Sequence, residues 1–448
     1  MIGKGFNSIY IEKTKSRKRK PGYGWIILGL TFGNLFVEGG VKNSQPVFLP
    51  ALRQGLGGSA AMTAAIFSTS GLIGAFIAPI LGKLLDMFGA RYMFPLSGIV
   101  ILIGWWASSM VNHMWQLFIF YSIIAALGHI LIGSFSGTAV LAPWFPRTKG
   151  VMLGIADSGN PAAQAIITPL AQYTISNFGW RTGFQVLGVI FFLVVAPLNF
   201  LFQRKPPGDG DDLNASDNVE SILDDTAANE NATLLDQDTD ALIYDDQQFN
   251  PLKEPAVWLL LLSKATQGIS SQMTYLHIIA FFVLAGYGEM QSASAIGVAG
   301  LFGVGARPCF GILSDKFGRE IVYTVGMLMT ALSLVVIILF TKNASLWPLL
   351  LFVGLTGLSD GVSGLLIGVK ASDIYPAHVL GSVMGVIEVG RGIGIATGGV
   401  LAGLLFDIYG DYTSAYWIAV FLILLSIVSI WTAKLVRPKS FIGIPADI

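Results

Sequence analysis

Long apolar stretches alternate with short polar segments along almost the entire chain. Three of these stretches contain no Asp, Glu, Lys or Arg, namely Tyr92–Met110, Trp115–Val140 and Phe184–Phe202. A helix needs about 20 predominantly apolar residues to cross the hydrocarbon core of a bilayer, so each stretch is long enough. Hydropathy predicts twelve such segments, near residues 24–49, 60–85, 92–110, 114–141, 149–175, 181–203, 256–284, 291–313, 321–341, 346–369, 379–406 and 413–434. The pattern predicts an all-α polytopic membrane protein.

The composition agrees with this pattern. Hydrophobic residues fill 53% of the 448 positions and charged residues 12%, against about 25% charged residues in a soluble chain. The mean hydropathy is +0.67. The lone cysteine, Cys309, excludes an intramolecular disulfide framework. The first apolar stretch is long enough to be a retained helix, so we expect no cleaved signal peptide.

The basic residues predict the orientation of the chain. Seven of the 27 Lys and Arg residues lie in the N-terminal arm, and only Arg53, Arg181 and Lys342 fall on the opposite side of the predicted membrane. Thirteen more share the side of the arm: Lys83, Arg91, Arg147, Lys149, Arg204, Lys205, Lys253, Lys316, Arg319, Lys370, Lys434, Arg437 and Lys439. Because loops rich in Lys and Arg stay in the cytoplasm, we expect both termini on the cytoplasmic side of the cell membrane.

One segment, residues 204–255, interrupts the apolar pattern. It contains 13 acidic residues between Asp209 and Asp246, and no basic residue lies between those two. Such a segment cannot bury a core, so we expect a disordered cytoplasmic linker; a regulatory or docking role is the alternative. The predicted organisation is a six-helix bundle with a basic cytoplasmic arm (1–203), the linker (204–255) and a second six-helix bundle (256–448).

A ten-residue pattern occurs twice, at 82–91 and at 311–320, after the second and the eighth predicted segments. It is formed by Gly82, Asp86, Gly89 and Arg91 in the first copy and by Gly311, Asp315, Gly318 and Arg319 in the second. Glycine permits a tight turn, and the aspartate can cap the next helix or pair with a nearby arginine. Such a contact would hold one conformation and release in another. The repeat predicts two halves of parallel topology, as in many secondary transporters, with the substrate site between them.

Both copies resemble the cytoplasmic signature of the major facilitator superfamily, G-x-x-x-D-R/K-x-G-R-R/K. The second copy matches it almost completely, whereas the first has Met87 where a basic residue is usual. The resemblance implies twelve helices in two six-helix bundles. The repeat and the hydropathy predict a central cavity lined by segments one, four, five, seven, eight, ten and eleven.

Arg307 stands out within the eighth predicted segment. The repeat offset of 229 residues places Ala78 at the equivalent position of the first half, so the fold itself does not require a cation there. An ionisable group inside a membrane span is costly and therefore a candidate for function. A guanidinium binds a carboxylate through two parallel hydrogen bonds. We expect Arg307 to anchor an anionic substrate; an internal ion pair, for example with Asp360, is the alternative.

Other polar side chains within the spans add candidates for the same cavity. His277 titrates near neutral pH and can donate to an anion, so we expect it to bind substrate and to carry a proton. Asp360 is the second candidate proton carrier. Glu38 and Lys42 are spaced i to i+4, so they either neutralise each other or leave Lys42 for the substrate. Asn34 lies one turn earlier on the same face as Glu38 and is a further candidate substrate ligand.

Glu388 and Arg391, spaced i to i+3, are expected to serve packing and gating. The charges within the spans balance, which favours internal pairing for most of them. The acids are Glu38, Asp157, Asp360 and Glu388, and the strong bases are Lys42, Lys264, Arg307 and Arg391.

Several motifs resemble one branch of the superfamily, the monocarboxylate transporter family. "PGYGWIILG" is similar to the entry motif of the family, although it departs in its first two positions. "WFPRTKGVMLGIADSG", at 144–159, is similar to the second signature. The resemblance places Lys42, in "GGVKNSQPVF", at the family's lysine in segment one. It places His277, in "TYLH", at a histidine of bacterial relatives and Arg307, in "GARP", at the family's arginine in segment eight.

The resemblance implies a secondary active transporter for a small monocarboxylate such as lactate or pyruvate, which works by alternating access and with a proton. Mammalian members carry a proton-coupling aspartate four residues before the arginine, where this chain has Gly303. Oxalate/formate exchangers are also similar in pattern, so anion exchange is an alternative. A receptor that binds a solute without moving it is an alternative from another class.

No enzyme is expected. "GVGARPCFG" contains G-x-G but lies within a predicted span, without the strand and helix of a dinucleotide site. Four scattered histidines and one cysteine do not suggest a metal site. The predicted partners are a small organic anion, a proton and the lipid bilayer; we expect a monomer without cofactor or nucleic acid.

Overall fold

The computed structural model describes residues 22–145, 148–204, 250–341, 344–360, 362–375 and 377–436. Within these ranges the chain is helical and forms no β-strand, which confirms the predicted fold class. Residues 1–21 of the basic arm and 205–249 of the acidic linker lie outside the described residues. The expectations for these two segments remain predictions.

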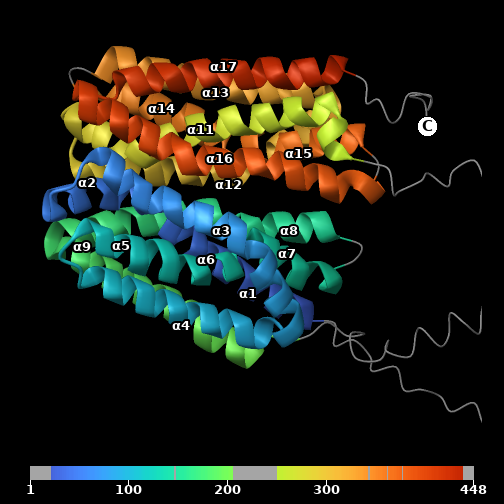
Figure 1. The fold of residues 1–448 in the computed structure, drawn as a ribbon, viewed down its shortest axis with the longest axis horizontal. Helices are drawn as coiled ribbons and strands as arrows, with labels where there is room; N and C mark the ends of the chain where they lie inside the picture. The colour runs from blue at the N-terminus through green and yellow to red at the C-terminus, as the bar shows by residue number, and fades with distance from the viewer. Residues whose placement is uncertain are drawn as a thin grey trace, which may run out of the picture.

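The helices form two bundles that lie one above the other in Figure 1. The first bundle, blue to green, contains α1 (Tyr23–Asn43), α2 (Gln45–Leu56), α3 (Ala60–Phe88), α4 (Ala90–Ser109), α5 (Met114–Ile119), the π-helical turn η1 (Phe120–Ala125), α6 (Ala126–Ile132), α7 (Ser134–Leu141), the 3-10 turn η2 (Ala142–Trp144), α8 (Lys149–Asp157) and α9 (Gly159–Phe202). The second, yellow to red, contains the 3-10 turn η5 (Pro251–Lys253), α11 (Pro255–Leu284), α12 (Glu289–Phe317), α13 (Arg319–Phe340), α14 (Leu346–Ser359), α15 (Val362–Ile374), α16 (Ala377–Tyr409) and α17 (Thr413–Leu435).

The two copies of the repeated pattern form the same backbone turn. Gly89 joins α3 to α4 with a φ of 76°, and Gly318 joins α12 to α13 with a φ of 92°. Glycine adopts such positive φ values without strain, which confirms the tight turn predicted for both copies. We call the end of the bundles with these turns the motif end, and the opposite end the far end.

Several predicted spans are broken helices. The first breaks at Ser44 between α1 and α2, the fifth at Ser158 between α8 and α9, and the tenth after Ser359 between α14 and α15. Conversely, α9 holds two predicted spans, which separate at Gly179, where φ is 83°. In transporters, non-helical backbone within the membrane occurs where it lines a cavity or is buried in protein.

Seven of the described helical segments are long and apolar enough to cross a membrane on their own. An eighth qualifies if Glu289–Arg307 and Cys309–Phe317, which are bent by 45°, form one span. The second and tenth predicted spans appear as the shorter apolar helices Ala60–Gly74 and Leu346–Ser359, and the fifth and sixth share one segment. The seventh, α11, is an unbroken helix of 30 residues that is not among the seven. The element order is therefore consistent with twelve spans.

Helices α9 and α12 carry much of the contact between the bundles. Gly300 lies so close to α9 that a Cβ there would be 2.7 Å from the carbonyl oxygen of Pro161. A Cβ at Gly297, one turn nearer the far end, would be 3.1 Å from the Pro169 ring. At the far end Gln172 donates to the Glu289 carboxylate at 2.9 Å. Small residues thus let these two helices approach closely, as is common in membranes.

Helices α3 and α16 form a second seam at the far end. The Asp407 carboxylate accepts hydrogen bonds from the backbone N–H groups of Ala60 and Ala61, at 2.9 and 3.0 Å. An acidic side chain is favourable at a helix N-terminus, so a residue of one bundle caps a helix of the other. Among the described residues, the hydrogen bonds between bundles lie from mid-span to the far end.

Candidate functional site

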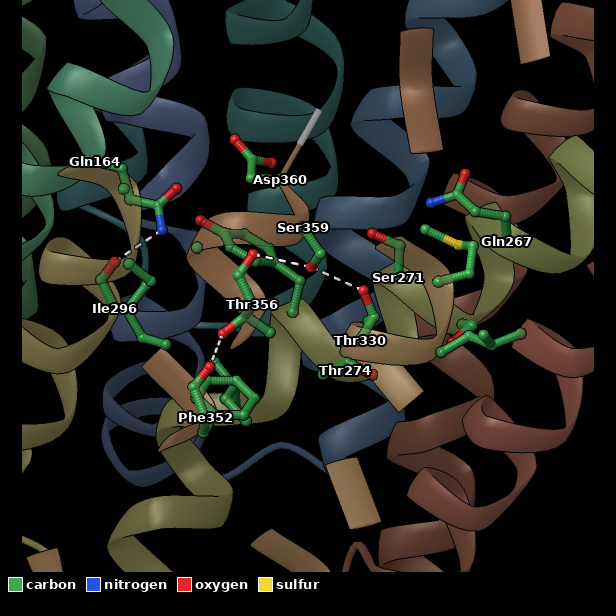
Figure 2. A pocket seen from close by; sticks show the side chains of 18 residues that line it. Gln164, Gln267, Ser271, Thr274, Ile296, Thr330, Phe352, Thr356, Ser359 and Asp360 are labelled. Atoms are coloured by element: carbon green, nitrogen blue, oxygen red, sulfur yellow. Dashed lines mark hydrogen bonds between the residues drawn. The ribbon is translucent and has the colours of Figure 1, made fainter. Parts of the chain in front are cut away.

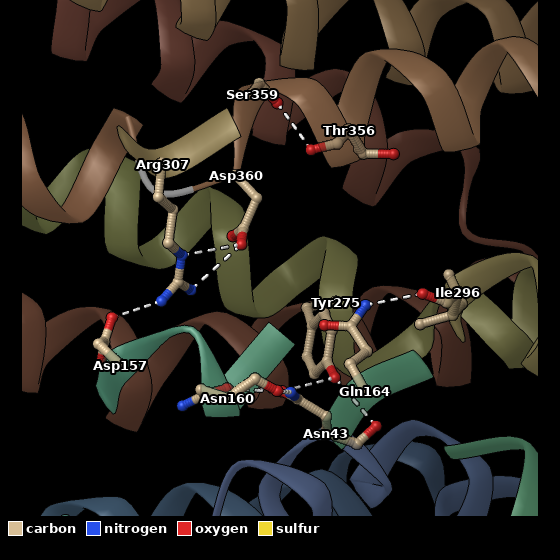
Figure 3. A network of polar contacts seen from close by, with 10 residues as sticks. All are labelled: Asn43, Asp157, Asn160, Gln164, Tyr275, Ile296, Arg307, Thr356, Ser359 and Asp360. Atoms are coloured by element: carbon tan, nitrogen blue, oxygen red, sulfur yellow. Dashed lines mark hydrogen bonds and ion pairs between the residues drawn. The ribbon is translucent and has the colours of Figure 1, made fainter. Parts of the chain in front are cut away.

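Arg307 of α12 binds two carboxylates at mid-span (Figure 3). Its Nη1 lies 2.6 Å from Asp157 Oδ2, while Nη2 and Nε lie 3.1 and 3.2 Å from Asp360 Oδ2. Asp360 belongs to the same bundle as Arg307, whereas Asp157 belongs to the other. The three side chains are 27%, 39% and 42% exposed for Arg307, Asp157 and Asp360 respectively. The guanidinium therefore joins the bundles without being sealed off between them.

The local sequence explains how Asp360 reaches the guanidinium. Asp360 caps the C-terminus of α14 in an extended conformation, with φ −61° and ψ 136°. Its carboxylate lies over Gly303, one turn before Arg307, where an added Cβ would be 2.7 Å from Asp360 Oδ2. Gly303, the position at which the family resemblance implies an acid, thus leaves room for a carboxylate from another helix.

Asp157 reaches the same guanidinium from the first bundle. It is the last residue of α8, directly before the break at Ser158. The pair with Arg307 is the contact nearest the motif end among the described hydrogen bonds between bundles. From the sequence, Asp157 was only one of several charges within the spans that balance one another. Its pairing with Arg307 could not be predicted, because the two residues belong to different bundles.

A polar cluster follows next to this triad (Figure 3). Asn43, at the end of α1, donates to Asn160 Oδ1 at 3.1 Å, and Tyr275 of α11 donates to the Asn43 carbonyl at 2.9 Å. Gln164 of α9 donates to the Ile296 carbonyl at 2.8 Å. Sequence reasoning missed these amides and the tyrosine; the positions of Asn43 and Asn160 beside helix breaks are the signal that could have indicated them.

A cavity of about 160 Å³ adjoins Asp360, mostly within the second bundle (Figure 2). Its polar lining consists of Gln164, Gln267, Ser270, Ser271, Thr274, Tyr275, Thr330, Thr356, Ser359 and Asp360. The Thr274 hydroxyl oxygen is buried and makes no hydrogen bond within the described part of the chain. A cavity of about 150 Å³ holds a benzene molecule in another protein, so this cavity has room for a small solute.

His277 lies away from the triad. It is fully buried; Nε2 lies 2.9 Å from the Gly399 carbonyl and Nδ1 3.1 Å from the Tyr412 hydroxyl. A carbonyl only accepts, so Nε2 carries the proton and Nδ1 accepts from the tyrosine. Both nitrogens are thereby used within the second bundle.

The candidates in α1 do not contact Arg307 either. Asn34 and Asn199 form a reciprocal amide pair, at 2.8 and 3.1 Å, that joins α1 to α9. Lys42 is exposed and interacts electrostatically with Glu38. Glu38 also interacts electrostatically with Asp157, so it lies near the triad without being part of it.

Glu388 and Arg391 form the ion pair that their spacing predicted. Arg391 Nε lies 2.5 Å from Glu388 Oε2, and Lys264 Nζ of α11 lies 3.5 Å from Glu388 Oε1. The three charges join α11 to α16 within the second bundle. This placement suits packing better than contact with a substrate.

The second copy of the repeated pattern forms an ion-pair network at the motif end. Arg319 pairs with Asp315, as predicted, and its Nε lies 3.3 Å from Asp373 of α15. Next to it, Lys370 Nζ lies 2.6 Å from Glu320. All of these contacts lie within the second bundle, so they brace α12, α13 and α15 rather than join the bundles.

The first copy is braced differently. Arg91 Nε donates to the Phe200 carbonyl at 3.3 Å, which joins α4 to α9. The side chain of Asp86 lies outside the described residues, so its predicted capping or pairing role stays a prediction. Gly82 and Gly311 occupy equivalent helical positions in α3 and α12, and a Cβ at Gly311 would meet no described neighbour within 4 Å.

Comparison with known families agrees with this architecture. The model of the Major Facilitator Superfamily matches residues 30–319 and 304–446. Monocarboxylate transporter 12 of Xenopus laevis is 23% identical over 436 residues, which cover 95% of this chain and 92% of the relative. The oxalate:formate antiporter of Oxalobacter formigenes is 24% identical over 325 residues, which cover 72% and 70%. Both resemblances predicted from the motifs are confirmed.

Solved structures show the same fold at low identity. A bacterial homologue of the human lysosomal transporter Spinster, in an inward-facing and unoccupied conformation, aligns with a TM-score of 0.67 at 14% identity, over 94% of this chain and 98% of the other. The nucleoside transporter NupG aligns with a TM-score of 0.67 at 12% identity, over 92% and 98%.

Proposed function

Since this chain belongs to the major facilitator superfamily, we propose that it moves a small organic monocarboxylate across the cell membrane by alternating access. Acids of the lactate or pyruvate type are the substrates we propose. The observation that supports this most is the placement of Arg307, which binds carboxylates at mid-span while the bundles meet around it. The cavity beside Asp360 offers hydroxyl groups for the remainder of such a molecule.

The charges of the triad also support coupling to a proton. With both aspartates ionised, Arg307, Asp157 and Asp360 carry one net negative charge, and a bound anion would make it two. A proton on Asp360 offsets the added charge. Proton symport also makes the cycle electroneutral, which avoids about 2.3 kcal/mol per 100 mV for an anion moved against the membrane potential.

We assign this proton to Asp360 rather than to His277. The Asp360 carboxylate touches Arg307 and is 42% exposed. His277 is buried with both nitrogens bonded, and its two partners lie in the same bundle. A proton on Asp360 weakens its hold on the guanidinium and thus acts directly on the anion site.

The conformation fits a carrier that is open to the cytoplasm. The distribution of Lys and Arg supports a cytoplasmic location of the motif end. The seams at Asp407 and Glu289 close the far end. We propose that the structure represents the inward-open state of the carrier. We also propose that the protein works as a monomer in the plasma membrane.

Anion exchange remains the alternative mechanism, because an oxalate:formate antiporter is among the relatives. A receptor that binds an acid without moving it is the alternative from another class. Purified protein in liposomes distinguishes the three. Uptake of labelled acid into empty vesicles indicates net transport, uptake only into preloaded vesicles indicates exchange, and binding without uptake indicates a receptor.

The test uses one labelled acid at a time from lactate, pyruvate, formate, acetate and oxalate, with and without acid outside. We expect uptake of a monocarboxylate that rises when the outside is acidified. Absence of uptake for all five acids in vesicles that contain folded protein contradicts the proposal.

A further inference from the structure

The two carboxylates on Arg307 differ in how they are held. Asp360 comes from the same bundle, takes two guanidinium nitrogens and lies in space that Gly303 leaves free. Asp157 comes from the opposite bundle and takes only Nη1. The first is a fixed part of the site, and the second depends on how the bundles meet.

Nη1 is the nitrogen that an incoming acid needs. Asp360 occupies the side of the guanidinium formed by Nε and Nη2. A second carboxylate that binds through two parallel hydrogen bonds must therefore use Nη1. Asp157 Oδ2 already lies 2.6 Å from Nη1, so a substrate carboxylate on this edge has to displace Asp157 or lie against its negative charge, and the two compete.

Building on the proposed function, we infer that Asp157 stands in for the substrate carboxylate on Arg307 when the carrier is empty. Its carboxylate then supplies from the first bundle the charge that the substrate supplies when bound. Asp360 alone leaves Nη1 without a carboxylate, and a buried donor without a partner is costly. With Asp157 on Nη1, the empty carrier can cross between its two conformations without this cost. Asp157 thereby permits net transport rather than exchange alone, and it weakens substrate binding by competition.

The experiment compares Asp157→Asn with wild type in liposomes, using the acid of the panel that shows Arg307-dependent uptake. Net uptake is measured into empty vesicles and exchange into vesicles preloaded with the same unlabelled acid. We expect Asp157→Asn to keep exchange and lower its half-saturation concentration about tenfold, as expected for ~1.4 kcal/mol of relieved competition. Net uptake should fall about tenfold or more relative to exchange.

Three matched variants complete the test. Asp157→Glu keeps the charge and should retain net uptake, while Asp157→Ser repeats the neutralisation in case the asparagine variant does not fold. Asp411→Asn neutralises an exposed acid that caps Thr413 at the far end and should behave as wild type.

Several results overturn the inference. An unchanged half-saturation concentration with an unchanged ratio of net uptake to exchange means that Asp157 does not compete. Loss of both activities in folded Asp157→Asn and Asp157→Ser means that it serves translocation of the loaded carrier. Wild-type protein that exchanges without net uptake also contradicts the inference but leaves anion transport intact. The absence of any transport contradicts the proposed function itself.

Discussion

Replacing Gly303 by alanine should separate Asp360 from Arg307 without removing any polar group. The new Cβ would lie 2.7 Å from Asp360 Oδ2 and 3.4 Å from its Cβ and Cγ. The first distance is too short for a carbon and an oxygen, so the carboxylate has to move. It then leaves the positions 3.1 and 3.2 Å from the guanidinium nitrogens.

The size of the effect follows from these contacts. A hydrogen bond to a charged group contributes about 1.5–3 kcal/mol, which corresponds to roughly a ten- to hundredfold change in an equilibrium constant. Alanine in a helix favours folding by up to ~1 kcal/mol over glycine, so the helix itself should not be weakened. We therefore expect Gly303→Ala to be folded, and its uptake driven by external acid to fall by a factor of roughly ten to one hundred.

Gly305→Ala is the matched control, because a Cβ at Gly305 would meet no described neighbour within 4 Å. The assay is initial uptake of labelled acid into liposomes over a series of imposed pH gradients, normalised to the inserted protein. If Gly303→Ala and Gly305→Ala respond to the gradient like wild type, Asp360 does not couple the proton through Arg307.

Three further predictions follow from single positions. The double variant Gly303→Asp/Asp360→Gly moves the acid from position 360 to α12. It should recover the proton-driven uptake that Asp360→Gly alone loses; equal inactivity of both variants in the uptake assay argues against the coupling role. His277→Gln should lower the free energy of unfolding by about 1–3 kcal/mol, because its buried hydrogen bonds are disturbed, yet keep the response to external acid; a lost response in folded protein would restore His277 as proton carrier. Gly318→Ala should cost about 1–3 kcal/mol of stability in thermal unfolding, because its φ of 92° and ψ of 146° form a combination that is nearly confined to glycine. Gly311→Ala has free space and should not lose stability; equal melting temperatures of the two variants contradict this.

Much of the fold could be predicted because it depends on local patterns. Apolar length predicts spans, and the spacing of Gly89 and Gly318 predicts equivalent turns in both halves. The pair between Glu388 and Arg391 depends only on helical spacing. Such features need no knowledge of which helices touch.

The site could be predicted only in part, because it depends on contacts between distant helices. Arg307 could be predicted as a functional residue because the equivalent position of the first half holds Ala78, which is not a cation. Asp360 was the expected partner in the alternative interpretation. The role of Asp157 could not be predicted, since a balanced set of charges does not say which pairs meet. At Gly303 the sequence showed only that an acid expected from the family resemblance is absent. That the glycine leaves room for the Asp360 side chain depends on the break after α14, which could not be predicted. The burial of His277 likewise depends on α16 and α17.

Binding to purified Arg307 variants tests the central claim most directly. Calorimetry compares the transported acid with its neutral amide, for instance lactate with lactamide, in wild type, Arg307→Lys and Arg307→Ala. The account predicts that Arg307→Ala loses about 2–5 kcal/mol of affinity for the acid, by analogy with truncated charge pairs, and that the weak binding of the amide is unchanged. Arg307→Lys should restore part of the loss, since it keeps the charge without the planar fork. Wild-type affinity of Arg307→Ala for the acid would contradict the account, because the carboxylate would then be held by another group.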